Sequence, residues 1–167
     1  MTGLILRRAR PEDADFLTEL AGEAFATYGD YRPLIAAWAD NPFVEVTLAE
    51  SDGARAGFAI LSFLRPGEAP RTKVGDLLAL AVAAPLRGRG IGRALLTHVV
   101  ARARDVARRE GISALRLAVA EGNTAARSLF ESAGFAYRDA EGSYPRGQKA
   151  LHMSLDLRAR ARWRRLI

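Results

Sequence analysis

The first third of the chain alternates between the apolar spacing of strands and that of helices. Pro11 followed by two acidic residues is a favourable helix opening, and Asp52-Gly53 between two apolar stretches is a hairpin signal. The pattern predicts strands over 4–6, 44–48 and 57–64, a helix from 11 to about 25, and a shorter helix over 33–38.

The middle of the chain contains its most apolar segment. Residues 74–82 carry only one charge, that of Asp76, which predicts a central strand covered on both faces. A loop over 65–73 precedes this strand. A glycine-rich turn follows it, and apolar residues then recur at helical spacing from Ile91 to about Arg109.

The last third predicts a strand, a helix and two closing strands. Asn123 is well placed to cap the helix, and Gly134 should end it in the left-handed conformation, which would fold Phe135 back onto Phe130. The expected strands are 115–119, 135–138 and 150–157, the last two joined by a polar loop over 139–149. This order of elements indicates a mixed α/β (α+β) fold with helices packed on a twisted sheet.

Composition narrows the class of protein. The 167 residues, 49% of them hydrophobic, suit one domain over 1–157 followed by an arginine-rich tail over 158–167. The absence of cysteine excludes disulfides and a thiol nucleophile. With no apolar run near ~20 residues, we expect a cytoplasmic protein that contacts no membrane.

The net charge of +6 comes mainly from arginine and suits an anionic partner. Composition alone does not separate nucleic acid, a phosphorylated cofactor and a plain compositional bias. Nucleic-acid binding is the least favoured of these interpretations. A homodimer is compatible with the sequence, which leaves the oligomeric state open.

The glycine-rich turn has the composition of an anion site. It reads Arg87-Gly88-Arg89-Gly90-Ile91-Gly92 and leads directly from a strand into a helix. Unpaired amides at a positive helix terminus, with no side chains to block approach, favour a pyrophosphate. A Walker loop would need Lys-Ser/Thr after Gly92, and a dinucleotide fingerprint would need a small residue at Arg93, so neither alternative fits.

The same turn resembles the Arg/Gln-x-x-Gly-x-Gly/Ala pattern of the GNAT superfamily of N-acetyltransferases. Further similarity lies in the opening Leu6-Arg7-x-Ala9-x-x-Glu12-Asp13, in Leu80-Ala81-Val82, in Asn123-x-x-Ala126-x-x-Leu129-Phe130-x-x-x-Gly134-Phe135 and in Gly147-x-x-Ala150-x-x-Met153. These segments follow the family's order and cover nearly the whole chain. The resemblance implies a mostly antiparallel twisted sheet of six to seven strands with about four flanking helices.

The resemblance also implies acetyl-CoA as the acetyl donor, with no metal. Strand backbone would pair with the pantetheine arm, and the turn amides would hold the pyrophosphate. The implied contacts are Leu80, Ala81, Val82, Arg87, Gly88, Arg89, Gly90, Ile91, Gly92, Arg93, Asn123 and Phe130. Asn123 can equally serve as a simple helix cap.

Two residues are candidates for proton transfer. The acceptor amine must lose a proton, and Asp76 would share a face with Leu80 and Val82 in a regular strand, although a bulge would change this. Many members of the family have a tyrosine as the acid where this chain has Phe130. Tyr144 could replace it or contact substrate. The alternatives are an ion-paired Asp76 and an exposed loop Tyr144.

The expected function is transfer of an acetyl group from acetyl-CoA to a primary amine of a small molecule or peptide, by direct attack in a ternary complex. A catalytically weak acyl-CoA-binding module of the same fold is the alternative, motivated by Phe130. The acceptor pocket would be built from 28–38, 65–73 and the closing hairpin, which do not identify the amine.

Overall fold

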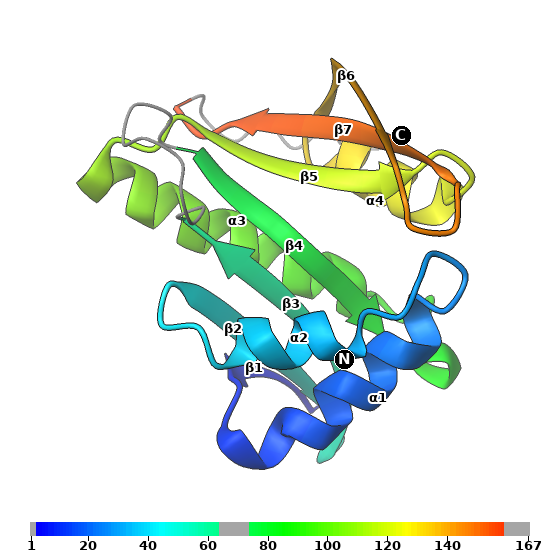
Figure 1. Cartoon of the computed structure of the whole chain (residues 1–167). Coiled ribbons are helices and arrows are strands. Elements are labelled where there is room, and N and C mark those ends of the chain that lie inside the picture. Colours follow the sequence, from blue (N-terminus) through cyan, green and yellow to red (C-terminus); the bar gives the residue numbers. More distant parts are fainter. Residues whose placement is uncertain (1–2, 64–73, 159–167) are drawn as a thin grey trace.

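The fold is a seven-stranded sheet with four α-helices (Figure 1). A computed structural model of the chain describes residues 3–63 and 74–158. The strands are β1 (Leu4–Arg8), β2 (Val44–Ser51), β3 (Ala54–Ser62), β4 (Val74–Val82), β5 (Ala114–Ala120), β6 (Ala136–Ser143) and β7 (Lys149–Asp156). The α-helices are α1 (Ala14–Ala24), α2 (Arg32–Ala39), α3 (Ile91–Glu110) and α4 (Thr124–Ser132), and short 3-10 turns lie at Pro11–Asp13 and Ala84–Leu86.

The strands are ordered β1-β2-β3-β4-β5-β7-β6 across the sheet. Among the described strand pairs, β4–β5 alone is parallel, and the other five are antiparallel. This arrangement confirms the expected mixed, mostly antiparallel sheet. The predicted loop 65–73 lies outside the described residues, as does the tail after residue 158.

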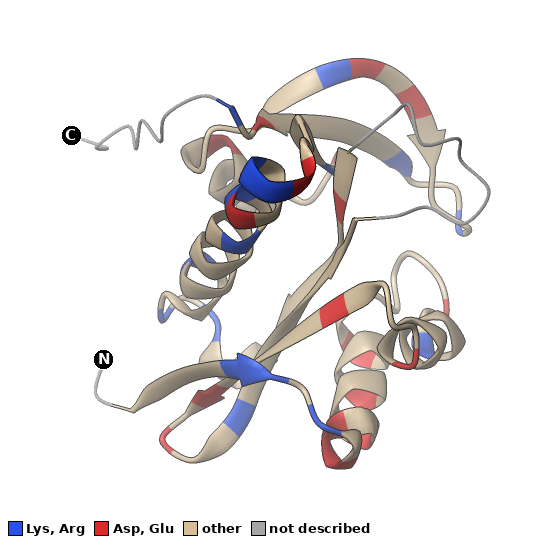
Figure 2. Cartoon of the chain, turned by 90° about the vertical axis from the view of Figure 1, so that its left-hand side faces the viewer, with Lys and Arg blue, Asp and Glu red and all other residues tan. Residues whose placement is uncertain are grey.

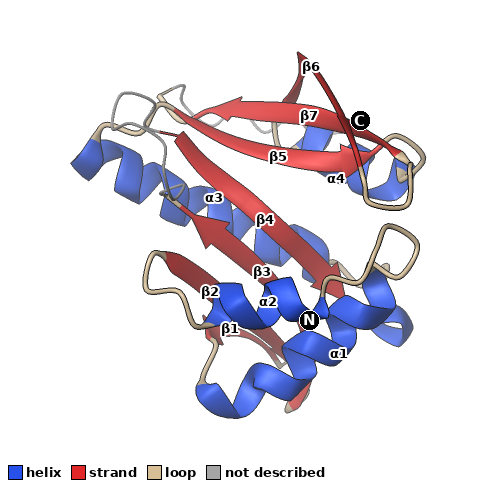
Figure 3. Ribbon diagram, in the orientation of Figure 1, coloured by secondary structure: helices blue, strands red, loops and turns tan. Residues whose placement is uncertain are grey.

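The helices cover the sheet from both sides (Figure 3). α1 and α2 pack on β2, β3 and β4 through a core that includes Leu17, Leu20 and Ile35. α3 and α4 lie on the opposite face, where Leu95, Val99 and Phe130 belong to a second buried cluster. Two apolar layers therefore hold the sheet between them near β4, as the predicted buried central strand requires.

The expected helix ends are confirmed around α4. The Asn123 side chain accepts a hydrogen bond from the Ala126 amide at 3.2 Å, which caps the first turn. Gly134 has a φ of +97°, and the rings of Phe130 and Phe135 meet edge to face with centroids 5.9 Å apart. The left-handed glycine thus reverses the chain onto its own helix, as predicted.

The closing hairpin differs from the prediction. β6 continues to Ser143 through a register shift between Arg138 and Glu141, so the connecting turn is only 144–148 rather than the predicted polar loop 139–149. β6 is an edge strand with most side chains exposed. Because no face of this strand is buried along its whole length, polar residues occupy it without the alternation that marks a half-buried strand.

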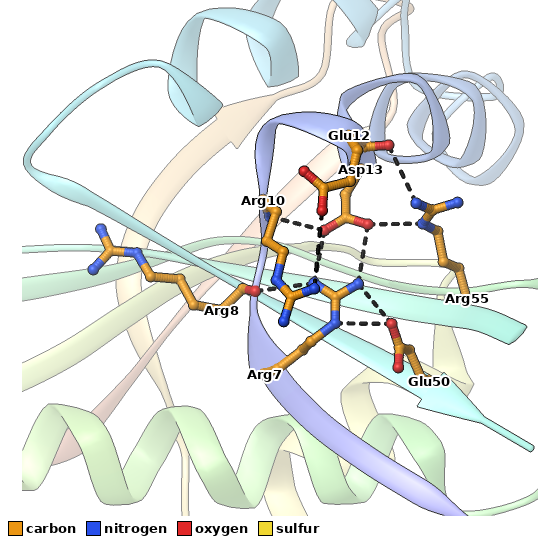
Figure 4. A network of polar contacts seen from close by, with 7 residues as sticks. All are labelled: Arg7, Arg8, Arg10, Glu12, Asp13, Glu50 and Arg55. Atoms are coloured by element: carbon orange, nitrogen blue, oxygen red, sulfur yellow. Dashed lines mark hydrogen bonds and ion pairs between the residues drawn. The ribbon is translucent and has the colours of Figure 1, made fainter. Parts of the chain in front are cut away.

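The N-terminal half contains a polar network around one buried carboxylate (Figure 4). The Asp13 carboxylate is fully buried and accepts hydrogen bonds from Arg7 at 2.7 Å, from Arg55 at 2.7 Å and from the Arg10 amide at 2.8 Å. Arg7 also donates to Glu50 at 2.8 Å. The hydrogen bond from Arg7 is the main cause that holds the pKa of Asp13 well below its usual range. This network ties β1, β2 and β3 to the start of α1.

Charges are spread unevenly over the elements (Figure 2). Acidic side chains dominate α1, whose charged residues are Asp15, Glu19 and Glu23, whereas the described Lys and Arg residues lie on several separate elements. Within the described residues, no helix combines the length and apolar composition that crossing a membrane requires.

Candidate active site

A slot opens between β4 and β5 near the middle of the sheet. The two strands pair at only three positions, Val74–Ala114, Gly75–Leu115 and Asp76–Arg116, and then separate. A cavity begins there, lined by residues 77–80 of β4 and 117–120 of β5. The sheet therefore contains a gap flanked by two strands whose facing edges are not joined.

The free edge of β4 presents backbone groups toward this gap. The Ala83 amide donates to the Ala56 carbonyl of β3 at 2.8 Å. Because bonded positions alternate along an antiparallel pair, Ala81 directs its backbone to β3, whereas Leu80 and Val82 direct theirs toward β5. The Val82 carbonyl accordingly accepts from Arg87 Nε, at 2.9 Å, rather than from a strand. The backbone groups of Leu80 and Val82 thus face the gap, and their pairing with pantetheine stays a prediction.

The glycine-rich turn forms the end of the slot at the start of α3. Gly88 and Gly90 have φ values of +76° and +82°, a conformation that favours glycine, and Gly90 is the N-cap of α3. The first amides of a helix have no acceptor within it, and they point outward from its positive end. Apart from Gly88 itself and its two chain neighbours, no atom of the described residues lies within 4 Å of the position that a Gly88 Cβ would occupy. An anion can therefore approach this backbone closely.

Ile91 and Gly92, which follow Gly90, are less exposed than Gly88. Ile91 is only 1% exposed, so any contact it makes with a ligand must come from its backbone. A Cβ on Gly92 would lie 3.6 Å from Leu129 and 3.7 Å from Val82, which is ordinary packing. The packing of α3 on β4 and α4 would therefore accommodate a Cβ at position 92. Arg89 and Arg93 are exposed around the turn and add positive charge.

Asn123 and Phe130 both line the cavity. The Asn123 oxygen already accepts the capping hydrogen bond of α4, so its role as a helix cap is confirmed, and its contact with a cofactor stays a prediction. Phe130 is 7% exposed and packs on Phe135. It supplies an apolar wall but no proton at the position where the family often has tyrosine.

Asp76 is buried at the point where β4 and β5 separate. The prediction that it shares a face with Leu80 and Val82 is wrong, because β4 contains a bulge. Leu77 pairs with Leu61 and Ala79 with Ile60, which leaves Leu78 as the extra residue.

The bulge moves side chains from one face of β4 to the other. Leu77, Leu80 and Val82 pack in the layer of α3, whereas Leu78, Ala79 and Ala81 pack in the layer of α1 and α2. Since neighbouring residues of a strand alternate, Asp76 lies on the α1–α2 side, one residue before the cavity lining. The carboxylate is therefore on the face of the sheet that also holds the aromatic residues described next.

Tyr144 is a partly buried wall of the cavity, so the alternative of an exposed loop tyrosine is wrong. Its ring centroid lies 4.9 Å from that of Tyr28, with the planes tilted by 35°. Burial raises the pKa of Tyr144 to about 12. The phenol therefore keeps its proton at neutral pH.

An aromatic cluster lies on the same side of the cavity. It consists of Phe25, Tyr28, Tyr31, Trp38 and Tyr144, which come from the α1–α2 region and the β6–β7 turn. Phe25 and Tyr31 meet edge to face at 5.7 Å. The sequence predicted that segment 28–38 contributes to the acceptor pocket, but it did not indicate Phe25 or the contacts between these rings. The signal that could have found them is the high density of aromatic residues in 25–38.

The aromatic cluster is closed on one side by a contact that we term the clasp, formed by residues 27–31 and 144–148. Gln148 Nε2 donates to the Thr27 carbonyl at 2.6 Å, and the Arg146 amide donates to the Tyr28 carbonyl at 3.2 Å. The clasp brings the N-terminal helices and the closing hairpin together across the slot (Figure 1). Within the described residues, no group of three or more His, Asp or Glu side chains could hold a metal ion.

Comparison with known proteins agrees with this geometry. The family model of the acetyltransferase (GNAT) family matches residues 12–135. A mycothiol acetyltransferase of Salinispora tropica is 32% identical over 155 residues, which are 87% of this chain and 48% of that protein. The chain thus spans about half the length of this curated relative.

Solved structures of low sequence identity share the fold. The yncA protein of Salmonella typhimurium, solved with its cofactor acetyl-CoA, is 22% identical with a TM-score of 0.74, covering 96% of this chain and 98% of that one. Ard1 of Thermoplasma volcanium is 21% identical with a TM-score of 0.75, covering 93% and 98%.

Proposed function

The chain belongs to the acetyltransferase (GNAT) family, and we propose that it transfers an acetyl group from acetyl-CoA to a primary amine. The observation that carries this proposal is the slot between β4 and β5, which has a free strand edge along one wall and an amide-rich helix start at its end. A long ligand with a peptide-like arm and a pyrophosphate fits both features.

The residues present suit acetyl-CoA. The backbone of Leu80 and Val82 would pair with the amides of the pantetheine arm, and the amides from Gly88 to Arg93 would hold the pyrophosphate. Phe130 and Asn123 would border the arm from α4. Acetyl-CoA would supply an activated acetyl thioester.

The reaction needs a neutral amine, and an alkylamine with a pKa near ~10.4 is mostly protonated at neutral pH. Asp76 is our candidate to accept that proton, directly or through water, because it is buried beside the point where the slot opens. Attack by the acceptor nitrogen would then form a C–N bond as the C–S bond breaks, and the second proton that the nitrogen loses would balance the proton taken up by the leaving sulfur. This is direct transfer in a ternary complex, without an acetylated enzyme.

The leaving sulfur requires little acid assistance, since a thiol has a pKa near ~8.5. Tyr144 is our candidate proton donor because it lines the cavity and remains protonated at neutral pH. Phe130 cannot take this role. In this chain the donor would therefore come from the closing hairpin and not from α4.

Thermal unfolding with acetyl-CoA tests the proposal. Ligand binding to the native state raises the melting temperature. We expect Gly90→Ala to weaken acetyl-CoA binding about tenfold, because a φ of +82° strains alanine and displaces the amides of the turn.

Gly111→Ala is the matched control. Gly111 has a φ of +73° at the other end of α3, so its substitution should strain the chain similarly and leave acetyl-CoA affinity unchanged. No stabilisation of the wild-type protein at millimolar acetyl-CoA would contradict the proposal. Equal loss of affinity in both variants would show that the turn itself is not the binding site.

A second candidate function is an acyl-CoA-binding module with little turnover, favoured by the buried phenylalanine at position 130. A panel of amines and peptides with detection of free thiol separates the two. Tight acetyl-CoA binding without thiol release across the panel favours the module, and thiol release that depends on the amine favours the enzyme.

A further inference from the structure

The acceptor side of the cavity is built almost wholly from aromatic and apolar side chains. The aromatic cluster forms one part of this wall, and Ile35 and Leu78 complete it. The rings of Tyr28 and Tyr144 pack against each other, with centroids 4.9 Å apart and planes tilted by 35°, so they form one continuous aromatic surface. Such walls stabilise an apolar or aromatic group by removing its surface from water.

The described lining of this cavity contains no charged side chain. Its polar side-chain groups are the phenols of the three tyrosines, the indole N–H of Trp38 and the Asn123 amide. Burial raises the pKa values of Tyr31 and Tyr144, so both phenols are neutral. A carboxylate that entered would lose its hydration without gaining a cation from the described lining, which is unfavourable.

The same cavity favours an ammonium group. The faces of tyrosine, tryptophan and phenylalanine attract cations, and this attraction grows when water is excluded. Asp76, on the same face of the sheet, adds a carboxylate one residue from the lining. The amine can thus enter protonated and lose its proton beside the slot.

We propose that the acceptor is a primary amine attached to an aromatic or bulky apolar group, with no carboxylate beside the nitrogen. This inference rests on the proposed acetyltransferase function and narrows its substrate class. An arylalkylamine is the simplest such molecule: its ring fills the aromatic cluster while its nitrogen faces the slot. α-Amino acids are excluded by their carboxylate, and small polar amines leave the cluster unfilled.

Matched amines test this class directly. Phenethylamine and phenylalanine share ring, chain and nitrogen and differ only in the carboxylate. We expect kcat/KM for phenethylamine to exceed that for phenylalanine by about 100-fold, because the carboxylate would be desolvated without a partner. Ethylamine, which lacks the ring, should be poorer than phenethylamine by about tenfold or more.

Binding can be read without turnover through Trp38, which lines the cavity. The chain has two tryptophans, so Trp163→Phe leaves Trp38 as the single reporter. Titration with phenethylamine should change Trp38 fluorescence at concentrations where phenylalanine has no effect. This measurement separates the proposed amine class from the proposed acetyltransferase function. If phenethylamine changes Trp38 fluorescence but acetyl-CoA does not stabilise the protein, only the acetyltransferase function is rejected.

Substitutions at Tyr28 test whether the aromatic cluster binds the ring of the acceptor amine. Tyr28→Leu should raise KM for phenethylamine about tenfold by removing a ring face, with KM for acetyl-CoA unchanged. Tyr28→Phe keeps the ring and should bind like the wild type, which shows that the ring rather than the hydroxyl matters. Phe43→Leu removes an aromatic side chain that is 59% exposed and outside the cavity, and it should change neither constant.

Two results would overturn the inference. Phenylalanine acetylated as well as or better than phenethylamine would show that a cation pairs with the carboxylate, and Arg116, next to the lining residue Leu117, would be that cation. Failure of phenethylamine to change Trp38 fluorescence, with acetyl-CoA still stabilising the protein, would reject the aromatic acceptor alone.

Discussion

The two edges of β4 contrast sharply. Toward β3 the strand is paired from Asp76 to Val82, and the half of the sheet beyond it contains the closed Asp13 network. Toward β5 it is paired at three positions only, and the backbone groups after them face a cavity. One edge is bonded to a neighbouring strand, whereas along the other the Val82 carbonyl accepts from the Arg87 side chain instead of from a strand.

The strongest test of this contrast is Asp13→Asn. The substitution leaves Arg7 facing a neutral amide in place of a carboxylate, and we expect the free energy of unfolding in urea to fall by about 3 kcal/mol. Glu12→Gln is the control, because Glu12 is exposed and its change should stay within ~0.5 kcal/mol. If acetyl-CoA affinity falls in Asp13→Asn as steeply as stability does, the two edges are not independent.

Acid should destabilise the half of the sheet that contains the Asp13 network, because it protonates the Asp13 carboxylate. The pKa of Asp13 is lowered from its usual 3.8, so its contribution is present at neutral pH and is lost as the pH falls below about 4. Asp30 beside Arg32, with a pKa of about 2, and Glu45 beside Arg102 shift in the same direction.

Unfolding free energies measured from pH 7 to pH 3 check this expectation. The wild-type protein should lose stability below about pH 4 more steeply than Asp13→Asn does, and the loss should not exceed the effect of that substitution. Parallel curves for the two proteins would show that the Asp13 network does not contribute to acid sensitivity.

Substitutions beside the gap between β4 and β5 should change the rate of catalysis rather than the free energy of unfolding. Asp76→Asn should lower kcat by about 100-fold, which equals about 2.7 kcal/mol, with KM for acetyl-CoA unchanged. Tyr144→Phe should have a smaller effect, about tenfold. Asp76→Glu keeps a base and should retain part of the rate. Full activity in Asp76→Asn would exclude this carboxylate as the proton acceptor.

Much of this architecture could be predicted from local sequence. Gly90 and Gly134 marked the start of one helix and the end of another, and each needed a backbone conformation that favours glycine. The buried run 74–82 identified the central strand by its lack of charge. These features depend on neighbouring residues alone, so one sequence is enough to find them.

Other features depend on distant contacts. The bulge at Leu78 leaves no trace in a run where both faces are apolar, so the side of Asp76 could not be derived. β6 lacked alternation because it lies at an edge. The aromatic cluster combines residues from two regions more than 100 positions apart, such as Tyr28 and Tyr144, and only the fold brings them together.

The clasp has a consequence for how the protein is made. Gln148 and Thr27, which close it, are separated by 121 residues. During synthesis Tyr28 therefore emerges more than 100 residues before Tyr144, and the aromatic cluster can form only after the closing hairpin has been made. Loop-closure entropy must be overcome over that distance, so we expect the aromatic cluster to assemble after the elements that depend on local contacts.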